Sequence, residues 1–116
     1  MTILFLLNDR PYQSERAYNA LRLATSLAAN QENTVNLFLI GDAVHCAVRG
    51  EAVPEGHDDI GWMLARFAAG HRKVAVCRTC MDRRGIGEDA LIECAYRGSL
   101  DELARWTVEA DRVLVF

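Results

Sequence analysis

Short apolar runs alternate along this chain with segments of helical periodicity. Residues 3–7, 35–40 and 73–77 are apolar almost throughout, as parallel strands are when both faces of their sheet are covered. We expect a further strand over 112–116 and consider a brief one over 94–96. This alternation predicts an α/β fold, in which helices cover both faces of a mainly parallel sheet of about four or five strands.

The segments between these runs carry helix signals. A Ser99–Glu102 capping box predicts the start of a helix that runs to about residue 110. Helices are also expected from an N-cap at Ser14 to about residue 30, over 43–49, and from Asp58 or Asp59 to a C-cap at Gly70, while a short one is considered for 83–92. Residues 50–57 are predicted to form a loop.

The chain length and the net charge limit the kinds of protein that this sequence can encode. The chain has 116 residues, the size of one domain, so residues 1–116 are expected to form a single unit. The formal net charge of −3 disfavours nucleic-acid binding, which needs a basic surface. No apolar run reaches the roughly 20 residues that span a membrane. Without a secretion signal we expect a cytoplasmic protein, in which the four cysteines are more often thiols than disulfides.

A CxxC motif, Cys77-Arg78-Thr79-Cys80, directly follows the apolar run at 74–76. Cys77 should therefore stand at the carboxyl end of a strand, the edge where open α/β sheets bind ligands. Zinc is disfavoured because structural zinc sites normally use two such pairs, and we expect no metal and no cofactor. Dithiol redox chemistry of the thioredoxin type is disfavoured by the poor helix signal after the motif. Both cysteines could also simply be core residues, which is the interpretation we prefer for Cys46 and Cys94.

The remaining interpretation is a nucleophilic Cys77 that carries sulfur as a persulfide. Positive charge lowers the pKa of a thiol, and residues 71–84 hold five arginines and lysines against the single acid Asp82. Arg78 and Arg84 are the candidates for this electrostatic support. The alternative is that these charges are an ordinary solvated surface beside a buried strand.

Polar residues at the ends of the other predicted strands are candidates for a pocket at the same edge. Asn8 follows the first strand and Asp42 the second, and we group Asp82 and Gly85 of the cysteine segment with them. The alternative is that such residues are turn formers and helix caps. Trp62 and Trp106 fall in predicted helices, where they mark either a subunit interface or core packing.

Several segments together resemble one known family. They are Asn8 with Pro11-Tyr12 and Ser14-Glu15, Leu21-Arg22-Leu23-Ala24, Phe38-Leu39-Ile40 with Asp42-Ala43-Val44, Arg49-Gly50, Cys77 with Thr79-Cys80, Asp82 and Arg84-Gly85-Ile86, and Leu103-Ala104 with Trp106. On these residues the chain resembles, over nearly its whole length, the DsrE family of small sulfur-relay proteins. Within the family it is most similar to the YchN-like branch.

The resemblance implies a three-layer α/β/α sandwich of the Rossmann-like DsrE/F type that assembles into homotrimers or a homohexamer. It also implies that Cys77, with Gly85 eight residues later, accepts a persulfide from a donor protein and passes sulfur to an acceptor thiol. Cys80 belongs to the YchN-like branch and is a candidate resolving thiol. We therefore expect a sulfur carrier, with sulfurtransferase activity left open. The alternatives are a CxxC dithiol redox protein and a non-catalytic oligomeric module that binds a small ligand or a protein.

Overall fold

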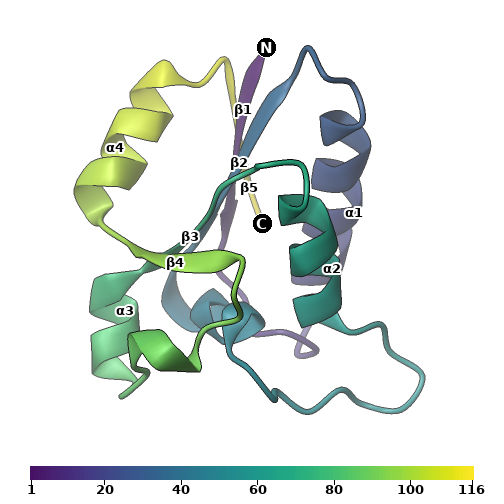
Figure 1. Ribbon diagram of the computed structural model, residues 1–116, viewed down its shortest axis with the longest axis vertical. Helices are drawn as coiled ribbons and strands as arrows, with labels where there is room; N and C mark the ends of the chain where they lie inside the picture. The colour runs from purple at the N-terminus through teal and green to yellow at the C-terminus, as the bar shows by residue number, and fades with distance from the viewer.

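A five-stranded parallel sheet forms the centre of the computed structural model, which describes residues 1–116 (Figure 1). The strands lie in the order β4-β3-β2-β1-β5. Their bounds are β1 Thr2–Leu7, β2 Thr34–Leu39, β3 Val74–Cys77, β4 Ala95–Gly98 and β5 Arg112–Val115. Every pairing is parallel, so the carboxyl ends of all strands meet at one edge. The predicted α/β class is confirmed, and the sheet has the larger of the two expected strand numbers.

Helices cover both faces of the sheet (Figure 1). On one face lie α1 (Arg16–Ala28) and α2 (Ile60–Ala68), whose buried side chains join the larger core cluster. On the other face lies α4 (Leu100–Glu109), which buries Leu103 and Trp106 against a smaller cluster. The side chains of successive strand residues point to opposite faces, and both faces are covered, which is why β1 and β2 are apolar throughout most of their length.

Three shorter helical segments connect the strands at the carboxyl edge. They are η1 (Gly41–Ala47), α3 (Arg78–Arg83) and η2 (Glu88–Ala90), and η1 and η2 are 3-10 helices. The sequence carries only a poor helix signal after the CxxC motif, yet α3 begins immediately after Cys77. Within the range considered for a short helix, 83–92, only Arg83, the last residue of α3, and η2 are helical.

Some of the residues predicted to cap the helices do so, and others do not. Asp59 caps α2, its carboxylate accepting a hydrogen bond from the backbone N–H of Trp62 at 3.2 Å. Ser14 lies one residue too early to cap α1, although its hydroxyl accepts from the N–H of Arg16 at 3.2 Å. Beyond α2, it is His71 rather than Gly70 that adopts a left-handed conformation, with φ of 64°.

The two tryptophans have different environments. Trp106 is buried and packs edge-on against Phe38, with ring centroids 6.2 Å apart, so it belongs to the core of this chain. Trp62 is 60% exposed, and the guanidinium of Arg66 lies over its ring.

None of the helices has the length and apolar character needed to cross a membrane.

The capping box predicted at the start of α4 gives a test of stability. Ser99 accepts a hydrogen bond from the N–H of Glu102 at 3.2 Å, which satisfies one of the free donors of the first turn. Ser99→Ala should lower the free energy of unfolding by about 1 kcal/mol, measured by urea denaturation. Ser99→Asp keeps an acceptor at this position and should stay close to the wild type; equal losses in both variants would argue against the cap.

Candidate functional site

Cys77 lies where β3 ends and α3 begins. All four residues of β3 are buried, and Cys77 itself is 4% exposed. Its side chain belongs to the smaller core cluster on the α4 face, together with Phe38 and Trp106. Cys77 is also the residue that precedes the first turn of α3. The strand therefore delivers the cysteine to the carboxyl edge of the sheet, as the apolar run before it predicts.

Cys80 sits within the first turn of α3, so the CxxC motif spans the junction of strand and helix. It is partly exposed, and its Sγ accepts a hydrogen bond from the backbone N–H of Gly41 at 3.2 Å. Gly41 opens η1, which follows β2. The segment that follows the neighbouring strand thus holds the second thiol in place through a backbone group. All four cysteines are free thiols.

Burial raises the pKa of the Cys77 thiol. Backbone N–H groups of Cys80 and Thr79 act in the opposite direction, while the adjacent Cys80 thiol raises this pKa as well. The expected electrostatic support from Arg78 and Arg84 is not among the leading influences on this pKa in the single chain. Cys77 is therefore mainly a neutral thiol near pH 7 when the chain is alone.

Two arginines near the cysteine pair are bound to carboxylates, whereas Arg78 is exposed and forms no ion pair. Arg84 donates two hydrogen bonds to the carboxylate of Asp42, at 2.8 and 3.1 Å, and a third to the carbonyl of Cys80 at 3.1 Å. Arg97 of β4 forms a two-bond pair with Asp82 at 2.8 and 2.9 Å. These arginines hold the pKa values of the Asp42 and Asp82 carboxyls below their usual range. Both pairs tie α3 to its neighbours.

The remaining predicted residues have local structural roles. The side-chain amide of Asn8 donates to the carbonyl of Phe116 at 3.1 Å and so joins the ends of β1 and β5. Gly85 has a φ of 64°, the left-handed conformation that lets the chain leave α3. In the single chain Asn8, Asp42, Asp82 and Gly85 line none of the clefts.

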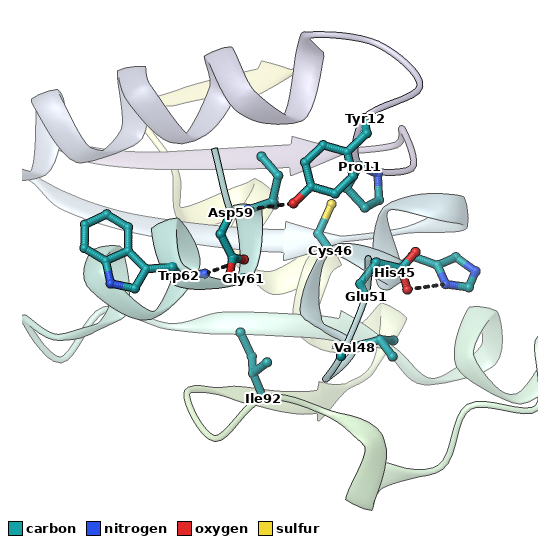
Figure 2. Close-up of a pocket in the computed structure, with 12 residues that line it drawn as sticks. Pro11, Tyr12, His45, Cys46, Val48, Glu51, Asp59, Gly61, Trp62 and Ile92 are labelled. Atoms are coloured by element: carbon teal, nitrogen blue, oxygen red, sulfur yellow. Dashed lines mark hydrogen bonds and ion pairs between the residues drawn. The ribbon is translucent and has the colours of Figure 1, made fainter. Parts of the chain in front are cut away.

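A cleft does occur at the carboxyl edge, but other residues line it (Figure 2). It has a volume of about 340 Å³, and its walls include Tyr12, His45, Glu51, Asp59 and Ile92. Tyr12 follows β1 and His45 follows β2, so the strand ends in the sequence indicate the correct edge. They do not indicate these residues, which stand several positions beyond each strand end. At no point do three or more His, Cys, Asp or Glu side chains gather as a metal site would require.

Comparisons with known proteins show the family and the fold of this chain. The model of the DsrE/DsrF-like family matches residues 1–116. Protein YchN of Escherichia coli K12 is 43% identical over 115 residues, covering 98% of this chain and 97% of YchN. Uncharacterized protein MJ0989 of Methanocaldococcus jannaschii is 32% identical over 117 residues and the full length of both chains.

Solved structures give the same result for the fold. A crystal structure of the ychN protein from E. coli has a TM-score of 0.93 at 41% identity and covers 100% of this chain and 99% of that one. The structure of MTH1491 from Methanobacterium thermoautotrophicum, a protein of unknown function, has a TM-score of 0.75 at 11% identity. It covers 99% of this chain and 98% of its own, and it supports the fold alone.

The raised pKa of Cys77 gives a test by alkylation. Because only the thiolate reacts, the rate of alkylation by iodoacetamide at Cys77 should still be rising at pH values where an ordinary thiol, with a pKa of about 8.5, has begun to level off. At pH 7 the rate should be several-fold below that of the denatured chain. Peptide mapping assigns the label to each cysteine. If the alkylation rate instead stopped rising below pH 8, the pKa of Cys77 would already be lowered in the free protein.

Proposed function

This chain belongs to the DsrE/DsrF-like family, and we propose that it is a cytoplasmic sulfur-relay protein that carries a persulfide on Cys77. Its partners would be a donor protein that bears a persulfide and an acceptor protein that offers a thiol. The observation that carries the proposal is the position of Cys77 at the carboxyl end of a buried strand, within a chain that matches the family over its full length.

The transfer needs no cofactor and no external oxidant. The Cys77 thiolate attacks the outer sulfur of the donor's persulfide, R–S–SH, and the sulfur–sulfur bond of the donor breaks. The products are Cys77–S–SH and the donor thiolate R–S⁻, so the electron pair of the broken bond leaves with the donor. Delivery to the acceptor repeats the exchange in the same sense.

Access to Cys77 is the step that the structure constrains most. At 4% exposure, its sulfur can meet a donor only after the surrounding segments shift. The six residues of α3 are held by the Gly41–Cys80 hydrogen bond and the Asp42–Arg84 and Asp82–Arg97 pairs. The two ion pairs lie at the surface, so docking of a partner can exchange them at small cost. In this proposal Arg84, released from Asp42, supplies positive charge to the thiolate.

Mass spectrometry tests the carrier role. The reduced protein, incubated with glutathione persulfide, should gain one sulfur atom on Cys77 in its intact mass, and a second protein thiol should remove it. Cys77→Ser should abolish the gain, whereas Cys80→Ser should keep it. Cys46→Ser is a matched control, because that thiol is buried and burial raises its pKa to about 12. Sulfur gained equally by Cys77→Ser would refute the assignment.

A dithiol redox role is the second candidate, favoured by the closeness of the Cys80 thiol to Cys77. Here Cys80 would attack the inner sulfur of Cys77–S–SH and release hydrogen sulfide as the Cys77–Cys80 disulfide forms. The same experiment separates the two roles: a two-hydrogen loss on mild oxidation, requiring both cysteines, indicates the redox role. A chain in which neither change occurs would be a binding module.

We also propose that the chain acts as a homotrimer or homohexamer that uses the uncovered part of the α4 face. Val113 and Val115 of β5 lie on this face next to Leu4 and Leu6 of β1, and they remain 41% and 64% exposed. Val108, on α4, is 86% exposed. Exposed apolar side chains that cluster on a small domain, as Val113 and Val115 do on β5, are typical of a site of association.

Sedimentation tests the assembly. Val113→Lys places a charge in the proposed interface and should convert the oligomer to monomer at micromolar concentration in analytical ultracentrifugation, because burial of an unpaired charge opposes association. Val53→Lys is the matched control, since Val53 is 39% exposed and lies in the loop before α2. A wild-type monomer, or an oligomer unaffected by Val113→Lys, would contradict this use of the α4 face.

A further inference from the structure

We propose that the cleft between the β1–α1 turn, η1 and the start of α2 binds a small organic cation, an amine with an apolar body (Figure 2). This site is distinct from the cysteine pair and adds a ligand to the sulfur-relay role. Its volume of about 340 Å³ falls within the range of small-molecule pockets, which starts near 300 Å³.

The position of the cleft is the one that an α/β sheet reserves for ligands. Tyr12 follows β1, and His45 and Cys46 follow β2, so the cleft opens at the carboxyl edge of two adjacent central strands. It belongs to the α1 and α2 side of the molecule, because Cys46 and Ile60 are part of the larger core cluster. Cys77 belongs to the cluster on the opposite face.

The walls combine apolar surface with two carboxylates. Val48, Ile92 and the ring of Tyr12 supply the apolar part, and Glu51 and Asp59 supply the charge. Figure 2 shows Tyr12 and Cys46 together on one side of the cleft, with Val48 and Ile92 on the other. An aromatic face beside carboxylates is an arrangement that attracts ammonium groups.

The two carboxylates give the cleft a negative electrostatic potential, although Arg10 is paired with one of them. Glu51 is paired with Arg10 at 3.1 Å, while His45 lies 4.0 Å from its other oxygen. Asp59 accepts from the N–H of Trp62 and has no cationic partner. The pKa of Tyr12 is raised by burial and by the charges of Asp59 and Glu51, and Glu51 likewise adds to the raised pKa of Cys46. The cleft thus repels an anion and favours a cation.

The cleft is held open by a fixed turn. The hydroxyl oxygen of Tyr12 accepts from the backbone N–H of Ile60 at 3.1 Å, which ties the β1–α1 turn to the start of α2. Tyr12 has a φ of 73°, and its ring meets that of His57 edge-on with centroids 5.8 Å apart. A bulky side chain in the left-handed region stays there only when its surroundings fix it. Binding therefore needs little reorganisation of this wall.

Paired probes of equal size and opposite charge test the proposal. Propylamine, cyclohexylamine and phenethylamine are titrated beside butyrate, cyclohexanecarboxylate and 3-phenylpropionate, and protein NMR shifts are followed. At least one amine should bind saturably and shift the Trp62 indole and His45 signals, and its matching carboxylate should bind at least about tenfold more weakly, as loss of one charge-assisted contact implies.

Charge-neutral variants locate the site. Asp59→Asn should weaken the amine by about five- to tenfold while α2 stays folded, because asparagine caps a helix as well as aspartate does. Glu51→Gln should weaken it as well. Glu55→Gln makes the same change in net charge in the same loop but outside the cleft, and should bind as the wild type does.

Three results would overturn the proposal. The first is that none of the three amines binds, and the second is that amines and carboxylates bind equally. The third is that Asp59→Asn and Glu51→Gln both keep wild-type affinity. Sulfur loading of Cys77 is measured in parallel and should be unchanged in these variants, so failure of this site leaves the carrier assignment untouched.

Discussion

The structure depends on the parallel pairing of β1, β2 and β3, three strands that are apolar on both faces. Burial of both faces leaves these strands few polar positions of their own, so most functional groups have to come from the strand ends and the segments after them. The two features with chemistry, the cysteine pair and the cleft, both lie at the carboxyl edge. Cys77 packs on the α4 face of the sheet, whereas the cleft lies on the face covered by α1 and α2.

Burial also decides the character of Cys77. The strand that positions the thiol removes it from water, and this desolvation outweighs the backbone N–H groups that would favour a thiolate. Two nearby arginines are already paired with carboxylates, Arg84 with Asp42 and Arg97 with Asp82, and Arg78 is exposed to solvent. Basic residues that are close to Cys77 in the sequence therefore do not by themselves place positive charge beside its sulfur. A protein that carries reactive sulfur gains from this arrangement, since the thiol is protected until a partner docks.

The parts of the fold that were predictable from the sequence rest on local or periodic signals. The apolar runs indicated the strands, and Ser99 with Glu102 indicated the start of α4, because a cap acts between residues that are neighbours in the chain. Pairings between distant residues carry no such signal. Asp82 with Arg97 and Asp42 with Arg84 form only once the sheet brings β2, β3 and β4 together. For the same reason the cleft residues were not predicted. The short helix α3 was missed because no side chain caps its start, so the local signal is weak.

The seven residues of η1 touch both features. Its first residue, Gly41, binds the sulfur of Cys80, its second, Asp42, holds Arg84, and His45 and Cys46 form part of the cleft. Between them Ala43 and Val44 are completely buried. In evolutionary terms this segment is constrained twice: a substitution that changes its contact with the cysteine pair also shifts the wall of the cleft. Relatives that lack either feature should therefore vary more freely in η1 than those that have both.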